Sequence, residues 1–210
     1  MRRSLGTSAL RSPRLRRRLE NFPHHRLHPD GERRQALPEI GAHRVAVPSL
    51  MSIAIRRATP ADGAAIGRLG AGLLRAHYQF DPDRFMKPAE NCDARYASFL
   101  CAQLDHQDAL VLVAEEGADV VGYLYAAVEP LSWKELREEA GFIHDVFVDS
   151  GRRASGIGEA LLDAAFGWMR ERGVPRVILW TASVNESARH LFERRGFRST
   201  MIEMTKELGE

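Results

Sequence analysis

The chain has 210 residues and a formal net charge of +2, and 44% of its residues are hydrophobic. This composition is ordinary for a globular protein with a sizeable core, and no apolar run approaches the roughly 20 residues of a membrane span. The charge is uneven: residues 1–50 hold 11 arginines and 4 acids, whereas residues 51–210 hold 19 basic and 24 acidic residues. The acidic balance after residue 50 argues against nucleic acid as the main partner.

Residues 1–50 show no sustained apolar period and are interrupted by prolines, so we predict a disordered, arginine-rich extension. Its composition also resembles an organelle transit peptide or a nucleic-acid-binding arm. We favour a third hypothesis, in which Met51 is the true start and the extension comes from a mis-assigned upstream start. A strand and a well-signalled helix follow Met51 at once. The folded domain is therefore expected to span 51–210.

Helices and strands are predicted throughout the first half of this domain. In chain order, they are a strand at 53–57, a helix starting near Thr59 and Pro60, a helix at 89–105, and strands at 109–116 and 120–128. Thr59 suits the N-cap of its helix, and Pro60 suits the first helical position. A link rich in glutamate, without a clear period, follows at 133–140.

The most informative stretch, 142–172, predicts a buried strand, a basic turn containing glycine, and a helix. The first turn of a helix has four backbone N–H groups without intrahelical partners, and the helix dipole adds partial positive charge there. Gly156 and Gly158 permit close approach, and Arg152 and Arg153 add full charges. The turn therefore predicts a phosphate or pyrophosphate site. The P-loop and dinucleotide patterns both fail on the residues present.

The last part of the chain predicts a fifth strand at 174–183 and a helix capped by Asn185. Gly196 is placed for a left-handed C-cap, and a final strand is expected after Phe197. Hairpins combined with one strand–helix–strand crossover indicate an α/β (α+β) fold. We expect a mixed, mostly antiparallel sheet with helices on both faces.

These features resemble the GCN5-related N-acetyltransferase (GNAT) family over about residues 53 to 208. The family carries a turn with the pattern [Gln/Arg]-x-x-Gly-x-[Gly/Ala]. Arg153, Gly156 and Gly158 match its three defined positions. Asn185 and the pair Gly196 and Phe197 follow in the family's order. The resemblance implies a GNAT-like fold, acetyl-CoA as cosubstrate, no metal, and a possible homodimer.

The resemblance also implies positions for acetyl-CoA. Its pyrophosphate would lie on the backbone amides of Arg153, Ala154, Ser155, Gly156, Ile157 and Gly158. Its pantetheine arm would pair with the fourth strand at Val146, Phe147 and Val148. Asn185 would make a polar contact to the cofactor, although a plain helix cap explains it equally well.

His144 is the first candidate for the base that deprotonates the acceptor, because histidine titrates near neutrality. Its segment is similar to that of diamine acetyltransferases, where a glutamate is the proposed base, and Asp145 matches the aspartate that follows. A purely structural role for the pair of His144 and Asp145 is an alternative. Glu139 is the second candidate, with a solvated charge as the alternative. Phe192 stands where the family often has a tyrosine acid, and we expect it to pack in the core.

We therefore predict a cytoplasmic N-acetyltransferase whose acceptor amine attacks acetyl-CoA directly in a ternary complex. A bias of acidic residues near the site favours a cationic small molecule; these residues are Glu129, Glu135, Glu138, Glu139 and Asp145. Acetylation of a protein N-terminus or lysine is an alternative, and a non-catalytic acyl-CoA-binding module is another. Cys92 and Cys101 fit neither a metal site nor a disulfide framework, and neither nucleic acid nor a membrane is an expected partner.

Overall fold

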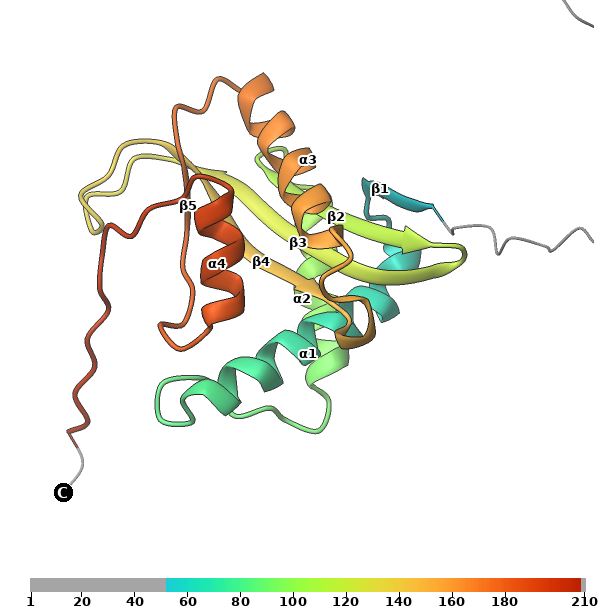
Figure 1. Cartoon of the computed structure of the whole chain (residues 1–210), viewed down its shortest axis with the longest axis horizontal. Coiled ribbons are helices and arrows are strands. Elements are labelled where there is room, and N and C mark those ends of the chain that lie inside the picture. Colours follow the sequence, from blue (N-terminus) through green and yellow to red (C-terminus); the bar gives the residue numbers. More distant parts are fainter. Residues whose placement is uncertain (1–51, 209–210) are drawn as a thin grey trace, which may run out of the picture. The chain divides into compact units, whose positions relative to one another are not determined.

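The computed structural model describes residues 52–208, and the extension predicted at 1–50 lies outside them. These residues build a five-stranded sheet around which the helices pack (Figure 1). Its strands, in both chain and spatial order, are β1 (Ile53–Arg57), β2 (Ala109–Glu116), β3 (Asp119–Glu129), β4 (Ala140–Val148) and β5 (Val177–Leu179).

The first four strands pair antiparallel, and β5 pairs parallel with β4. The parallel pair needs a crossover, which α3 (Ile157–Glu171) supplies. α1 (Gly63–Phe80) and α2 (Cys92–Gln103) cover one face of the sheet, and α3 with α4 (Glu186–Arg194) covers the other. The predicted mixed, mostly antiparallel sheet with helices on both faces is confirmed.

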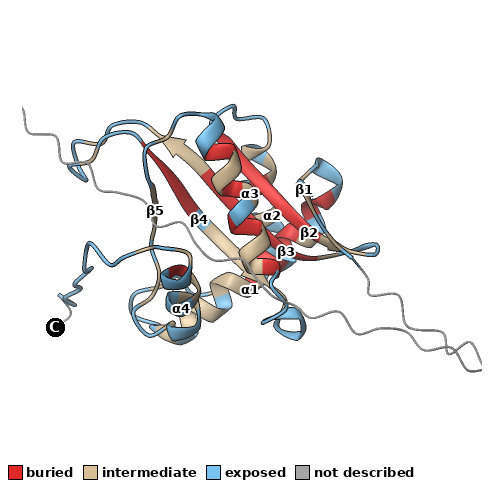
Figure 2. Cartoon of the chain, turned by 45° about the horizontal axis from the view of Figure 1, so that its top comes forward, coloured by how far each residue is buried: buried red, intermediate tan, exposed pale blue. Residues whose placement is uncertain are grey.

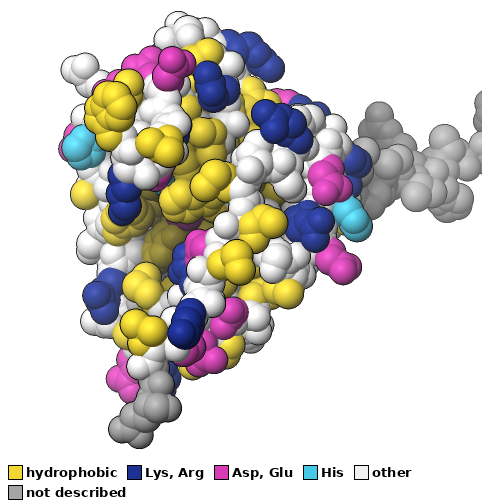
Figure 3. Space-filling view, turned by 90° about the vertical axis from the view of Figure 1, so that its left-hand side faces the viewer, with side chains coloured by type: hydrophobic (Ala, Val, Ile, Leu, Met, Phe, Trp, Pro, Cys, Tyr) yellow, Lys and Arg dark blue, Asp and Glu magenta, His cyan; other side chains and the backbone are white. Residues whose placement is uncertain are grey.

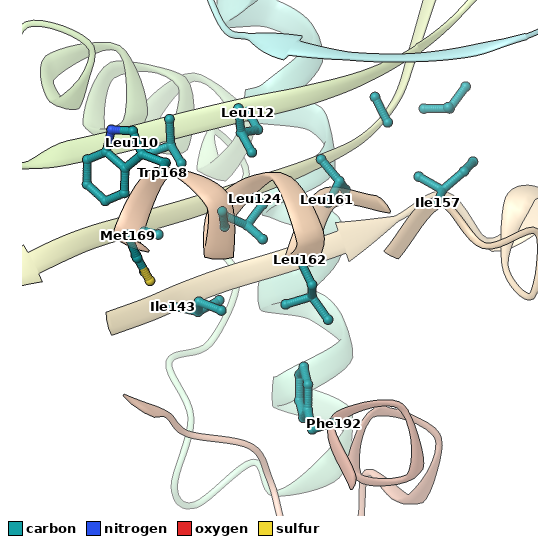
Figure 4. Close-up of a cluster of buried hydrophobic side chains, with 14 residues drawn as sticks. Leu110, Leu112, Leu124, Ile143, Ile157, Leu161, Leu162, Trp168, Met169 and Phe192 are labelled. Carbon is teal, nitrogen blue, oxygen red and sulfur yellow. The ribbon is translucent and has the colours of Figure 1, made fainter. Parts of the chain in front are cut away.

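The α3 face of the sheet has an almost entirely apolar core (Figure 4). Leu161 and Leu162 of α3 are fully buried against Leu124 and Ile143 of the sheet. Phe192 of α4 belongs to the same cluster, so its predicted role in packing is confirmed. Figure 2 shows that buried positions follow β2, β3 and the first half of β4. Burial is lower in the second half of β4, where the candidate site begins.

The predicted strand after Phe197 does not form in the described part of the chain, where residues 198–208 are coil beyond α4. Its apolar side chains, among them Ile202 and Met204, are strongly exposed. Glu203 of this segment pairs with Arg84 in the α1–α2 loop, so the segment contacts that loop instead of pairing with β5. The predicted fifth strand is also too long, because only Val177–Leu179 pairs with β4.

Within residues 52–208, no helix has both the length and the apolar character to cross a bilayer.

Candidate active site

The turn between β4 and α3 has the backbone geometry of an anion cradle. Ala154 and Gly156 have φ of +60° and +82°, in the left-handed region, with Ser155 between them. Alternation of this kind turns successive N–H groups toward one side, as in anion-binding nests. Among the described residues, none accepts a hydrogen bond from the backbone amides of residues 154–159. The cradle also lies at the positive end of the α3 dipole.

The two arginines of this turn have different surroundings. Arg152 forms an ion pair with Glu116, so its charge is already partly balanced. Arg153 has no carboxylate partner within residues 52–208; its Nε lies 3.4 Å from the Val148 carbonyl oxygen, and its guanidinium lies over the Phe147 ring. Arg153 is therefore the arginine that remains available to an anion at the cradle.

The two predicted glycines also differ. A Cβ built on Gly156 would meet no atom within 4 Å, so the cradle opens to solvent at this position. A Cβ on Gly158 would touch Leu191 at 3.4 Å, which places Gly158 against α4. Ile157 is buried with its side chain in the α3-face core, so only its backbone amide is available to a ligand.

β4 and β5 diverge halfway along β4. They pair only where residues 141–143 meet residues 177–179. Beyond Ile143, β4 still pairs with β3 through Val146, Phe147 and Val148, but its other edge has no strand partner within residues 52–208. Unpaired edges offer backbone donors and acceptors to an extended ligand. The predicted pantetheine residues therefore lie beside a backbone edge that a ligand could pair with.

His144 occupies a β-bulge at the point of divergence. Ala126 of β3 pairs with Ile143, and its neighbour Tyr125 pairs with Asp145, so His144 is the extra residue on β4. A bulge changes the alternation of side chains along a strand. Here it places His144 and Asp145 on the same face of the sheet, toward α1 and α2, instead of on opposite faces.

Two aromatic rings and one carboxylate hold the His144 imidazole. Tyr125 and Phe142 stack on it, with centroid distances of 4.8 and 4.9 Å. Its Nε2 lies 3.1 Å from Oε1 of Glu129, whose other carboxylate oxygen pairs with Arg137. Burial lowers the pKa of His144 below its ordinary value, and the Glu129 charge opposes this shift. The imidazole is thus held in place, and the lowered pKa favours its neutral form, which is the form that can accept a proton.

Asp145 lies beside the site, is only partly exposed and has its carboxylate engaged by two hydroxyl groups. It accepts hydrogen bonds from the Tyr96 hydroxyl at 2.7 Å and the Tyr123 hydroxyl at 3.0 Å. Burial raises the pKa of Asp145, while these two donors oppose the rise. The predicted pair of His144 and Asp145 is therefore brought together on one face, but the carboxylate in contact with the imidazole is Glu129.

Glu139 and Asn185 lie apart from this group. Glu139 is exposed at the start of β4, five residues before His144, a separation of about 16 Å along a strand. The Asn185 Oδ1 accepts a hydrogen bond from the Ala188 amide at 3.2 Å, so the predicted cap of α4 is present. Its side-chain NH₂ group has no hydrogen-bond partner among residues 52–208 and is available for a second contact.

Sequence reasoning missed the role of Glu129 and of the tyrosines. Glu129 was noted for its charge alone, since 15 residues separate it from His144 in the sequence. The tyrosines did carry a signal, because Tyr123 and Tyr125 alternate on β3 and therefore share a face. Nothing in the sequence placed Tyr96 of α2 beside Asp145.

Comparisons with known proteins agree with this geometry. The family model described as "Acetyltransferase (GNAT) family" matches residues 74–197. The uncharacterized N-acetyltransferase YhfO of Bacillus subtilis is 31% identical over 145 residues, covering 68% of this chain and 88% of that protein. A mycothiol acetyltransferase of Propionibacterium freudenreichii is 31% identical over 147 residues, covering 66% of this chain and 47% of that protein.

A solved tetramutant of the BH1408 protein from Bacillus halodurans has the same fold, with a TM-score of 0.64 and 26% identity. The match covers 74% of this chain and 99% of that one. The family match at residues 74–197 includes the residues of the cradle, the bulge and the diverging strands. The chain belongs to the acetyltransferase (GNAT) family and is an acetyl-CoA-dependent N-acetyltransferase.

Proposed function

We propose that the cradle and the free edge of β4 bind acetyl-CoA and that His144 takes the proton of an amine acceptor. Acetyl-CoA supplies the acetyl group as an activated thioester. The observation that carries the proposal is the position of His144: its imidazole lies 3.1 Å from Glu129 where β4 and β5 diverge, on the strand that leads into the cradle. Binding surface and base are therefore contiguous.

The cradle is suited to the pyrophosphate of the cosubstrate. Ala154, Ser155, Gly156, Ile157 and Gly158 would contribute their backbone amides. The Arg153 amide already donates to the Ser150 carbonyl oxygen at 3.5 Å, so Arg153 would contribute mainly the charge of its guanidinium. Val146, Phe147 and Val148 would present their backbone to the pantetheine amides. Asn185 would use its side-chain NH₂ group for the cofactor while Oδ1 keeps capping α4.

A base is needed because a lysine-like ammonium has a pKa near 10.4, so only about one molecule in a thousand is a free amine at neutral pH. The Glu129 carboxylate can only accept a hydrogen bond, so it favours the tautomer in which His144 carries its proton on Nε2. Nδ1 is then the lone pair that takes the acceptor's proton. We assign Asp145 a supporting role through Tyr96 and Tyr123, and Glu139 no contact with the acceptor.

Phe192 has no acidic proton to donate to the leaving thiolate, and its ring is buried in the α3-face core. The leaving thiol needs little assistance, because a thiol of pKa near 8.5 is a tolerable leaving group. We therefore propose direct attack by the amine in a ternary complex, with proton uptake by His144. The acceptor we propose is a small-molecule amine that is cationic at neutral pH.

Calorimetric titration of acetyl-CoA into the full chain tests the cradle. Gly156→Ala and Gly173→Ala form a matched pair at the two ends of α3: both positions have positive φ, and an added Cβ meets nothing within 4 Å at either. Each substitution should cost about 1–2 kcal/mol of folding free energy for the left-handed backbone. Only Gly156→Ala and Arg153→Glu should also weaken acetyl-CoA binding. Equal affinity in all four proteins would overturn the proposed cradle.

We also propose that the chain forms a homodimer. Met201, Ile202 and Met204 are exposed after α4, and the outer edge of β5 has no strand partner within residues 52–208. The exposed Glu207 of this segment is opposite in charge to Arg170, which lies near β5. A second copy could therefore pair its C-terminal segment with β5. Light scattering should give twice the chain mass, and a monomer after deletion of residues 198–210.

A further inference from the structure

A continuous row of six aromatic rings crosses the candidate site from α2 to the end of β5. In order, the rings belong to Tyr96, Phe99, Tyr125, His144, Phe142 and Trp180. Successive centroids lie 4.8 to 5.9 Å apart, within the range of about 4.5–7 Å at which aromatic pairs attract. The base of the proposed reaction thus sits in the middle of this aromatic row.

Burial divides the aromatic row into a supporting middle and accessible ends. Tyr125 and Phe142, which enclose the imidazole, are 9% and 3% exposed. Phe99 and Trp180 are 48% and 68% exposed. A single exposed aromatic residue is ordinary, but these two contact the buried rings on either side of His144. They offer apolar, flat surface within one ring of the base.

Trp180 is also the first residue after β5, at the point where β5 leaves β4. Its ring meets Phe142 edge-on, with a centroid distance of 5.1 Å and an interplanar angle of 82°. The same side of the molecule, where β5 and residues 198–208 lie, carries a hollow lined by hydrophobic side chains (Figure 3). A ligand on Trp180 would therefore enter beside the free edge of β4.

The nearby carboxylates offer little to a polycation. Glu129 is shared between His144 and Arg137, and Glu135 also pairs with Arg137. Glu138 lies 3.5 Å from Arg176. Asp145 accepts hydrogen bonds from two tyrosine hydroxyls and is only partly exposed. Glu129, Glu135 and Asp145 are therefore already engaged, whereas Glu138 and Glu139 stay exposed six and five residues before His144. The exposed side chains within one ring of His144 in the aromatic row are Phe99 and Trp180.

We propose that the acceptor is an arylalkylamine, that is, an aromatic ring joined to an amine by a short alkyl linker. This inference rests on the proposed acetyl transfer to an amine. The acceptor's ring packs against Trp180 or Phe99, and its amine reaches Nδ1 of His144. A protonated amine is also attracted to the faces of aromatic rings, so the aromatic row suits the ammonium before it loses its proton.

The test measures release of the CoA thiol with 2-phenylethylamine, propylamine and spermidine as acceptors, and follows acetyl-CoA binding by calorimetry. We expect the highest kcat/KM with phenylethylamine. Trp180→Ala should raise the KM for phenylethylamine about three- to tenfold more than that for propylamine, as loss of an aromatic pair predicts. Trp133→Ala is the matched control, because Trp133 is 83% exposed in the loop before β4 and lies outside the aromatic row. It should leave both KM values unchanged.

Two results would overturn the inference in different ways. If propylamine or spermidine matches phenylethylamine, or if Trp180→Ala behaves like Trp133→Ala, the aromatic acceptor is wrong while acetyl transfer to an amine stands. If acetyl-CoA binds but none of the three amines releases thiol, the proposed amine acceptor fails together with the inference.

Discussion

The two faces of the sheet carry different kinds of side chain. On the α3 face, aliphatic side chains fill the space between sheet and helix, and their contribution is burial of apolar area. On the face toward α1 and α2, hydroxyl, carboxyl and imidazole groups lie within the packing, each with a named partner. Apolar side chains such as Ile66, Leu69 and Leu100 are also buried on the second face. Both faces therefore stabilise the domain, and the second also places the chemical groups of the site.

β4 belongs to both faces, and its bulge sets the division. Ile143 and Val146 point into the α3-face core, whereas His144 and Asp145, between them, both point to the other side. Without the extra residue, one of these two polar side chains would be directed into the aliphatic core, where an unpaired polar group is costly. The bulge therefore keeps both polar side chains on the face that carries the site and both aliphatic neighbours in the α3-face core.

The largest expected effect is that of His144→Gln, which should remove the base and leave the core intact. We expect kcat/KM for acetyl transfer to fall about 10²–10⁴-fold, as loss of a general base typically does. The acid limb of the pH–rate profile, with its midpoint below the ordinary histidine pKa, should disappear. Urea unfolding should change little. His190→Gln, at an exposed position of α4, is the control and should keep full activity.

Leu161→Ala should have the opposite signature. Leu161 is fully buried on α3, so truncation should lower the free energy of unfolding by about 2–5 kcal/mol. Urea denaturation measures this loss. The KM values of the folded variant should match those of the parent protein, and a shifted acceptor KM would show that the two faces are coupled.

Tyr123→Phe tests the polar face for stability. It removes a hydrogen bond to the buried Asp145, at an expected cost of about 1.5–3 kcal/mol at pH 7. Tyr125→Phe is the control: its hydroxyl contacts the neutral Gln103 amide at 3.3 Å, and about 1 kcal/mol is expected.

The pH dependence of this cost has a definite sign. The Tyr123 hydroxyl lowers the pKa of Asp145 and burial raises it, so loss of the hydroxyl penalises the ionised carboxylate. The difference in the free energy of unfolding between Tyr123→Phe and the parent protein should be largest at pH values where Asp145 is ionised. It should shrink as pH falls through the pKa of Asp145. A cost that does not change with pH would mean that the hydroxyl does not stabilise the charged form.

The smallest expected effect is that of Glu129→Gln on the pH–rate profile. The Glu129 charge raises the pKa of His144, while burial and the Arg137 charge lower it. The substitution should therefore shift the acid limb to lower pH, while the Asp145 charge continues to raise the pKa of His144. A shift to higher pH would contradict the assigned contact between Glu129 and His144.

Much of the local structure could be predicted from the sequence. The hairpin of β2 and β3, the cap at Asn185 and the left-handed Gly196 follow from periodicity and turn chemistry, which depend on near neighbours. The cradle was predictable for the same reason, since a strand, a turn with glycine and a helix are contiguous in the sequence. The resemblance to the family rested on these same segments.

The sequence alone could not decide what depends on pairing between distant segments. The bulge at His144 exists only relative to the register of β3, and the contact with Glu129 follows from that register. The length of β5 depends on where it leaves β4, and the coil at 198–208 depends on contacts such as that between Arg84 and Glu203. Sequence periodicity determined which segments become helices and strands, because those preferences are local. Tertiary structure decided which side chains meet, because strand register and packing join residues that the chain keeps far apart.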